Sequence, residues 1–190
     1  MRRLMLVFSV SATLAVAAVG IAGAQSEGTD VPNTPANTAQ TSCDGSTIEL
    51  NALETRILEL HNQTRTDNGL PSLCVNPNLT EAARFHSQDM LDKGYLSHTS
   101  PDGETFPARF ERFGYSLEGW SYSEVGENVG VGSGSEGEPE AMFEAWMNSP
   151  EHRDNILREE FREIGMGAST GTYKGYSDTT VYTVDFGVRS

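Results

Sequence analysis

The stretch Trp146-Met-Asn-Ser-Pro-Glu-His-Arg-Asp-Asn-Ile156 combines the start of a helix with polar groups that carry chemistry. Ser149 is a good N-cap residue, Pro150 suits the first helical position, and Glu151 favours the positive end of the helix dipole. An imidazole in the first turn of a helix has its cationic form disfavoured, so we expect His152 to stay neutral. A neutral histidine can bind a metal ion or accept a proton, which makes His152 a candidate functional residue.

Two polar segments upstream carry similar chemistry. His98 begins the segment His98-Thr-Ser-Pro-Asp-Gly103, whose Pro-Asp-Gly sequence is typical of a turn at the surface. Glu127 lies in Gly126-Glu-Asn128, where the glycine lets a neighbour or ligand approach the backbone closely. Two histidines and one glutamate are the smallest set of protein groups for an open metal site or an acid–base pair. Spacing alone does not join these segments, because they share no helix.

The order and context of these segments resemble a known family. With Leu60-His-Asn-x-x-Arg65 upstream and Ile164-Gly-Met-Gly167 downstream, they are similar to the cysteine-rich secretory, antigen 5 and pathogenesis-related proteins. This CAP superfamily is also called the SCP-like extracellular domain, and the chain is similar to its bacterial-type members. The resemblance covers roughly residues 50–187. It implies an α+β fold, an α-β-α sandwich with helices on both faces of a small, mainly antiparallel sheet.

In that family, two histidines and two acidic residues commonly line a central cleft. The corresponding cleft residues here are His98, Glu127, Ser149 and His152. Ser149 stands where animal members carry the second glutamate, so the resemblance implies two neutral ligands and one anionic ligand. His98, Glu127 and His152 would then hold zinc or another divalent cation only weakly. The alternative is a structural cluster in which the same side chains satisfy one another by hydrogen bonds.

The sequence leaves three classes of function open. We favour a non-catalytic extracellular module that binds a metal, peptide, glycan or lipid. The alternatives are a zinc-assisted hydrolase of extracellular peptide or envelope polymer, and a structural envelope or adhesion protein. Ser149, His152 and Glu127 also include the residue types of a hydrolytic triad, but no G-x-S-x-G elbow surrounds Ser149. Because fold does not determine function, the sequence does not decide whether the protein is an enzyme.

Residues 1–24 have the pattern of an export signal. Arg2 and Arg3 precede the apolar run from Leu4 to Ile21, and Ala22-Gly-Ala24 supplies the small residues of a cleavage site. An uncleaved anchor is the alternative, because the run is nearly long enough to cross a bilayer. We therefore expect a secreted or cell-surface protein that has no membrane span once the signal is removed.

Residues 25–42 are rich in Thr, Pro and Asn and contain few large apolar side chains, which favours a flexible tether. Residues 43–190 then form the CAP domain. Cys43 and Cys74 flank the first expected helix, and an oxidising compartment favours a disulfide that would stabilise the fold by about 3–4 kcal/mol. Two free thiols are the alternative.

The charge of the chain bears on its partners. There are 27 Asp and Glu residues against 13 Lys and Arg, which gives a formal net charge of −14. Such an excess of negative charge repels nucleic acids and anionic membranes, so neither is an expected partner. The partner we expect is an extracellular ligand of unknown identity.

Periodicity predicts the main elements. A first helix should carry Leu53, Ile57 and Leu60 on one face, with Ser46-x-x-Glu49 as its capping box and Gly69 as its stop. The expected elements after it are helices over 78–93 and 105–113, a helix starting at Pro139, and strands over 164–168 and 181–186. His61 and His86 fall on apolar helix faces and are expected to be structural. Residues 115–137 are expected to be loop-rich because they contain six glycines.

Overall fold

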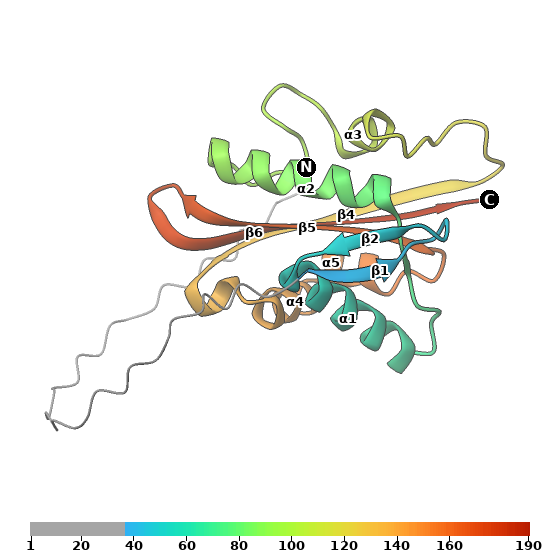
Figure 1. Cartoon of the computed structure of the whole chain (residues 1–190), viewed down its shortest axis with the longest axis horizontal. Helices are drawn as coiled ribbons and strands as arrows, with labels where there is room; N and C mark the ends of the chain where they lie inside the picture. The colour runs from blue at the N-terminus through green and yellow to red at the C-terminus, as the bar shows by residue number, and fades with distance from the viewer. Residues whose placement is uncertain (1–36) are drawn as a thin grey trace, which may run out of the picture. The chain divides into compact units, whose positions relative to one another are not determined.

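A four-stranded sheet, in the order β3-β5-β6-β4, forms the middle layer of the domain (Figure 1). The computed structural model describes residues 37–190. Antiparallel pairing joins β4 (Ser123–Ser133), β6 (Tyr176–Arg189) and β5 (Glu163–Tyr173), and β5 also pairs in parallel with the short β3 (Cys74–Val75). The expected mainly antiparallel sheet is therefore confirmed.

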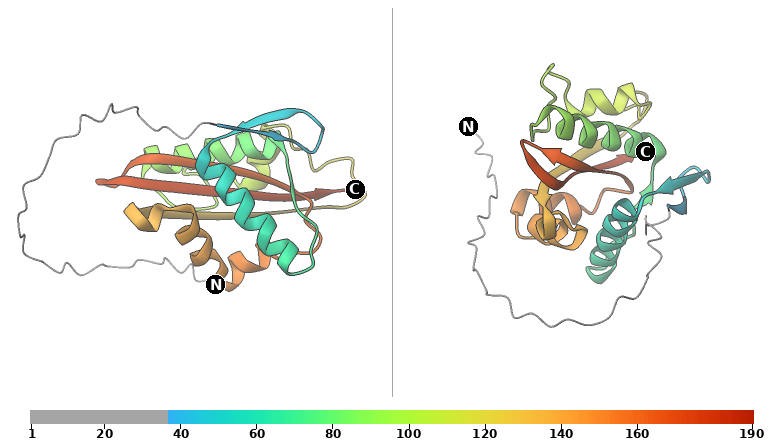
Figure 2. Two further views of the ribbon diagram at one scale, coloured as in Figure 1. Left: turned by 60° about the horizontal axis from the view of Figure 1, so that its bottom comes forward. Right: turned by 60° about the vertical axis from the view of Figure 1, so that its left-hand side comes forward.

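Helices cover both faces of this sheet, as the two views of Figure 2 also show. On one face lie α2 (Pro77–Lys93) and α3 (Phe106–Arg112); on the other lie α1 (Ala52–Asp67), α4 (Pro139–Met147) and α5 (Pro150–Ile156). Strand β6 is buried from Thr179 to Val188, as expected for a central strand with helices on both sides. The α-β-α sandwich is confirmed.

The start of α1 differs from the predicted one. Asn51, not Ser46, is the N-cap: its side chain accepts from the Glu54 N–H at 2.9 Å, and the Glu54 carboxylate accepts from the Asn51 N–H at 3.0 Å. The predicted box of Ser46 and Glu49 is wrong because Thr47–Leu50 forms strand β2. The hydrophobic periodicity of the helix was correct, but two candidate boxes lay within five residues of each other.

The second helix begins at Pro77, one residue before the predicted start, and its N-cap is Asn76. It ends as predicted at Gly94, which adopts the left-handed conformation with φ of 65°. His86 on this helix is fully buried, and its Nε2 lies 2.8 Å from the Ser97 carbonyl. His61 on α1 is also fully buried, with Nδ1 2.7 Å from the Ile57 carbonyl. Both histidines are core residues, as predicted.

The prediction of a loop over 115–137 is wrong for most of its second half, which forms β4 at the edge of the sheet. The glycines there allow close packing and do not interrupt the strand. A Cβ at Gly126 would lie 3.0 Å from the Phe161 ring, and one at Gly130 would overlap the sulfur of Met142. Small residues at alternate positions therefore let the α4–α5 layer approach this strand closely.

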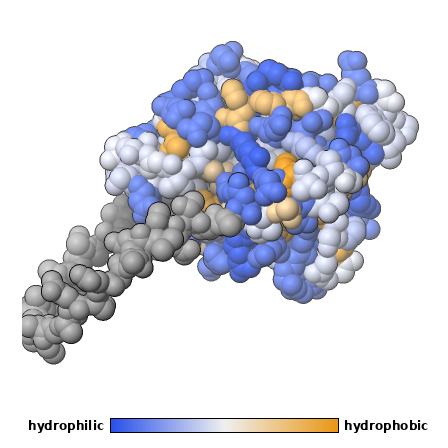
Figure 3. Space-filling model, in the orientation of Figure 1, coloured by the Kyte–Doolittle hydropathy of each residue, from blue (hydrophilic) through white to orange (hydrophobic). Residues whose placement is uncertain are grey.

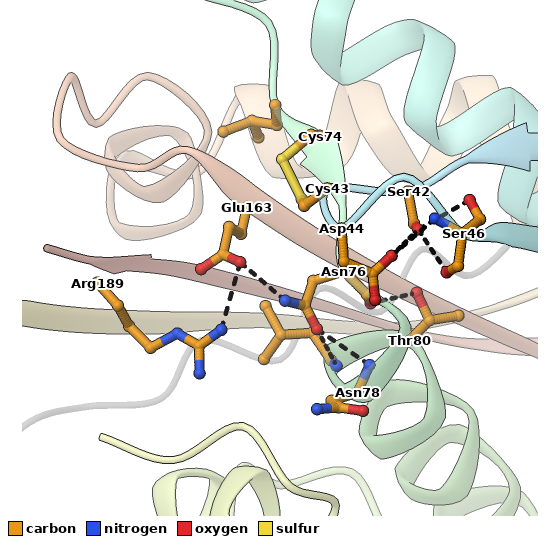
Figure 4. The surroundings of a disulfide bond; sticks show 12 residues. Ser42, Cys43, Asp44, Ser46, Cys74, Asn76, Asn78, Thr80, Glu163 and Arg189 are labelled. Carbon is orange, nitrogen blue, oxygen red and sulfur yellow. Dashed lines mark hydrogen bonds and ion pairs between the residues drawn. A yellow bond between two sulfur atoms is a disulfide. The ribbon is translucent and has the colours of Figure 1, made fainter. Parts of the chain in front are cut away.

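A two-stranded ribbon, β1 (Thr38–Thr41) with β2 (Thr47–Leu50), precedes α1. The end of the expected tether, residues 38–42, is thus part of the fold. Figure 4 shows Cys43, just after β1, bridged to Cys74 of β3, so the predicted disulfide is confirmed. The Cys43 N–H also donates to the Val75 carbonyl at 2.8 Å. The expected export signal and most of the tether, residues 1–36, lie outside the described residues.

Figure 3 shows a mainly hydrophilic face with a small apolar area over α2 and α3. There Phe85 is 40% exposed, and the Arg112 guanidinium lies 4.3 Å from its ring centroid. Within residues 37–190, no helix is both long enough and apolar enough to span a bilayer.

Candidate functional site

Glu127 lies on β4, directly opposite Asp185 of β6, and its side chain is fully buried. One carboxylate oxygen, Oε1, accepts a hydrogen bond from Nδ1 of His98 at 2.8 Å. The other, Oε2, accepts from Nη2 of Arg109 at 2.6 Å. Because both oxygens are engaged and the group is inaccessible, Glu127 is an internal partner of the site and does not face solvent.

His98 lies in the loop between α2 and α3, and its side chain is 36% exposed. It packs edge-on against the ring of Phe106, with centroids 6.3 Å apart. Its Nδ1 contacts Glu127, and within residues 37–190 no hydrogen bond reaches its other ring nitrogen, Nε2. His98 is therefore the member of this pair that a ligand can reach.

Arg109 lies on α3, and no motif in the sequence distinguishes it from the other arginine of this short helix, Arg112. Arg109 is fully buried, although arginine is seldom found inside a protein unless it is paired. Besides Glu127, its guanidinium donates to the Ser100 hydroxyl at 3.4 Å and to the His98 carbonyl at 3.5 Å. One residue thus contacts both the edge strand and the loop that carries His98.

Asp185 is a second buried acid beside Glu127, and nothing in the sequence distinguishes it from its neighbours in the strand. It falls within the strand expected over 181–186, and it is completely buried, with no hydrogen-bond partner for either carboxyl oxygen among residues 37–190. Burial raises the pKa of Asp185 well above its ordinary value, and the charge of Glu127 raises it further. The neutral acid is therefore the favoured form of Asp185 in the fold.

His152 and Ser149 belong to the layer on the other face of the sheet. Ser149 occupies the N-cap position of α5, as predicted, but its side chain makes no capping hydrogen bond. Its hydroxyl instead lies 2.8 Å from Nδ1 of His152. Burial lowers the pKa of His152, and the nearby His98 lowers it further, in agreement with the expected neutral imidazole.

Asn128 and Asn155 connect α5 to the edge strand. Asn128 donates to the His152 carbonyl at 3.1 Å, and Asn155 donates to the Asn128 side chain at 2.9 Å and to the Glu127 carbonyl at 3.3 Å. Asn128 and Asn155 therefore have a structural role in the two sequence segments that contain them. They fix the backbone of His152 relative to that of Glu127.

The four predicted site residues thus form two pairs, His98 with Glu127 and Ser149 with His152. Among the described residues, no hydrogen bond links His152 to Glu127, so Ser149, His152 and Glu127 are not arranged as a hydrolytic triad. The part of the chain in the structure contains no group of three His, Cys, Asp or Glu side chains placed to hold a metal ion. Zinc binding stays a prediction.

A hollow of about 310 Å³ lies beside α4 and α5, and none of the four predicted site residues lines it. It is bounded by Met147, Asn148, Pro150, Arg153, Asp154 and Leu157. Pro150, Arg153, Asp154 and Leu157 recur at helical spacing, whereas His152 and Asn155 belong to the side of α5 that contacts β4. This hollow is therefore distinct from the histidine site.

Sequence and structure comparisons agree on the class of protein that this sandwich and its polar residues define. A family model described as the cysteine-rich secretory protein family, CAP, matches residues 58–186. The chain belongs to this family of extracellular proteins.

Three similar proteins illustrate the relationship. YkwD, an uncharacterised protein of Bacillus subtilis strain 168, is 37% identical over 143 residues, which is 75% of this chain and 52% of that protein. An SCP-domain extracellular protein of Bacillus anthracis has a crystal structure with 30% identity and a TM-score of 0.56, covering 70% of this chain and 39% of that one. An outer surface protein of Borrelia burgdorferi, at 19% identity and a TM-score of 0.59, covers 73% and 93% and supports the fold alone. The chain spans about half the length of YkwD.

Proposed function

We propose that this protein is an exported extracellular binding module that holds its ligand at His98 without chemical turnover. The observation that carries the proposal is the engagement of Glu127. A general base or an acidic nucleophile needs a free carboxylate oxygen within reach of a substrate. Both oxygens of Glu127 are already bonded, to His98 at 2.8 Å and to Arg109 at 2.6 Å, and its side chain is inaccessible to solvent.

In this proposal, Glu127 orients His98 and is not itself a ligand. Glu127 occupies Nδ1 of His98, which leaves Nε2 for a ligand. Histidines that bind metals commonly donate their other ring N–H to a carboxylate in this way, which fixes the ring and raises its basicity. The pair therefore fits a zinc or other divalent cation whose protein ligands would be His98 and, if it turns toward the same ion, His152.

Such a cation would be held weakly. Ser149 supplies no charge where the family's animal members have a carboxylate, and Glu127 is engaged with Arg109. Two imidazoles alone give fewer protein ligands than the three of catalytic zinc sites. The rest of the coordination shell would come from water or from the bound partner, which suits reversible attachment of a peptide, glycan or lipid group.

Zinc titration calorimetry tests the proposal on the wild type, His98→Ala, His152→Ala and the control Glu104→Gln. Glu104 is an acidic residue of the same loop, but it pairs with Arg112 and lies outside the site. We expect weak binding in the wild type and the control, a loss in His98→Ala and a partial loss in His152→Ala. Equal heats in all four proteins would exclude a metal ligand at His98.

A turnover assay separates binding from catalysis. The zinc-loaded wild type is incubated with extracellular peptide and envelope polymer, and the products are analysed by mass spectrometry. We expect intact substrates. Cleavage that disappears in His98→Ala would overturn the non-catalytic proposal in favour of the zinc-assisted hydrolase. An exported protein that keeps its biological role when both histidines are replaced would instead favour the structural or adhesion class.

A further inference from the structure

The guanidinium of Arg109 is completely buried next to the carboxylate of Glu127. Burying a cation is costly unless it is paired and hydrogen-bonded, so packing alone does not account for it. Arg109 and Glu127 are both completely buried and lie 2.6 Å apart. The other arginine on the same helix, Arg112, is 43% exposed and pairs with Glu104 at the surface.

Arg109 contacts both the carboxylate that accepts from His98 and the loop that carries His98. Through Nη2 it holds Oε2 of Glu127, which leaves Oε1 for the imidazole. The same guanidinium also reaches the backbone carbonyl of His98 at 3.5 Å and the buried Ser100 hydroxyl at 3.4 Å. The 2.6 Å contact is the strong one, and the two longer contacts add direction rather than strength.

This geometry determines which nitrogen of His98 carries the proton. A carboxylate paired with a guanidinium only accepts hydrogen bonds, so the 2.8 Å contact requires a hydrogen on Nδ1 of His98. The neutral ring then has a lone pair on Nε2, the nitrogen that has no partner among residues 37–190. Unrestrained histidine favours the opposite tautomer, with the hydrogen on Nε2.

We infer that Arg109 is the positioning residue of this site, holding Glu127 so that His98 is fixed in the Nδ1–H tautomer with Nε2 available to a ligand. The role of Nε2 in holding a ligand rests on the proposed function. The tautomer of His98 does not depend on any ligand. A guanidinium suits the task because its planar fork can bond the carboxylate and the loop together, which a lysine ammonium does less well.

Nitrogen-15 NMR of the imidazole rings measures the tautomer directly. The labelled wild type is recorded at mildly alkaline pH without metal, and His98→Ala assigns the His98 signals among the four histidines. We expect a protonated Nδ1 and an unprotonated Nε2 at His98. A wild-type His98 with its hydrogen on Nε2 would overturn the inference at once, whatever the outcome of the zinc titration.

Variants then test the part played by Arg109. In Arg109→Met, His98 should shift toward the ordinary Nε2–H tautomer, whereas the matched control Arg112→Met, on the same helix, should keep the wild-type signals. Arg109→Lys retains the charge and should still fold if the methionine variant does not; we expect it to give a mixture of tautomers. An unchanged Nδ1–H signal in a folded Arg109 variant would show that Glu127 orients His98 without it.

Discussion

At the residue scale, the candidate site shows how a buried polar group changes its chemistry. Glu127 and Asp185 lie opposite each other on paired strands, but only Glu127 has the Arg109 guanidinium within hydrogen-bond distance. The two acids therefore differ: Glu127 accepts a hydrogen bond at each oxygen, whereas neither oxygen of Asp185 has a hydrogen-bond partner in the described part of the chain. Sequence alone found Glu127 through its family context, but a single Asp in an alternating strand carries no signal of this environment.

Asp185→Asn should stabilise the protein at neutral pH. Burial first, and the charge of Glu127 second, raise the pKa of Asp185. A raised carboxyl pKa means that the folded state retains a proton which the unfolded state releases above the ordinary value near ~4. The contribution of Asp185 to the free energy of unfolding is therefore complete below the ordinary carboxyl pKa near ~4. It falls as pH rises from that value toward the raised pKa of the folded state.

Calorimetric melting temperatures at acidic and neutral pH would check this expectation. Asp185→Asn should melt higher than the wild type at neutral pH, and the difference should shrink in acid. The exposed Asp154→Asn on α5 is the control and should show no such trend. A lower melting temperature for Asp185→Asn at neutral pH would contradict the expectation.

His61 should make the protein sensitive to acid. Burial lowers the pKa of His61 from 6.5 to about 4, so the unfolded state takes up a proton over a range where the folded state does not. The contribution of neutral His61 to the free energy of unfolding is complete above pH 6.5 and is lost as pH falls toward about 4. The loss amounts to about 3 kcal/mol. Urea unfolding should show a smaller loss over this interval in His61→Phe, and equal losses in the two proteins would rule out His61 as the source.

At the element scale, helices were easier to predict than the strands beside them. Helical periodicity placed α2 and α4 within about two residues, because each buries one regular apolar face. The sequence favours a loop where β4 lies, because glycines at this density usually interrupt a regular element. Their function is visible only once α4 and α5 pack against the strand, since a glycine that avoids a clash and a glycine that permits a turn look alike in a sequence.

The two possible capping boxes of α1 can be distinguished by mutation. Asn51→Ala removes the observed side-chain acceptor and should cost about 1 kcal/mol of unfolding free energy. Ser46→Ala removes the predicted cap, which lies before β2 and contacts only its own turn, and should cost less. Denaturant titration of both variants gives the comparison. A larger loss for Ser46→Ala would contradict the observed helix start.

Close contact between α2 and β5 depends on Gly165. An added Cβ there would overlap the backbone of Leu79 and Thr80, which cannot move without shifting the helix. Gly165→Ala should therefore cost about 1–3 kcal/mol or more. Gly171→Ala is the matched control on the same strand, because its Cβ would meet only the flexible Leu91 side chain at 3.1 Å. Equal melting temperatures for the two variants would be inconsistent with this packing.

At the scale of the whole molecule, the family resemblance predicted the three-layer arrangement, and cysteine placement predicted the disulfide. The sequence does not predict which side chains of the different layers contact one another. Tertiary structure alone brings Arg109 of α3 to Glu127 of β4 and separates Ser149 and His152, at the start of α5, from that pair. The relative positions of these three elements are set only when the sheet forms.

Removing the disulfide should weaken the fold without changing the site. Cys43→Ser with Cys74→Ser removes the covalent link between the β1–β2 ribbon and β3 and should lower the free energy of unfolding by about 2–4 kcal/mol. The His98 NMR signals should stay at their wild-type positions, because neither cysteine contacts that loop. Altered His98 signals would show that the ribbon influences the site.

The attachment of the two histidines to different layers has a mechanical consequence. His98 belongs to the layer of α2 and α3, and His152 to the layer of α1, α4 and α5, with the edge strand β4 between them. A ligand bound by both imidazoles would cross-link the two helical layers at the edge of the sheet. At a concentration of about 100 times its dissociation constant, such a clamp would add about 2.7 kcal/mol against unfolding. Occupancy would then slow proteolysis that proceeds through the unfolded state.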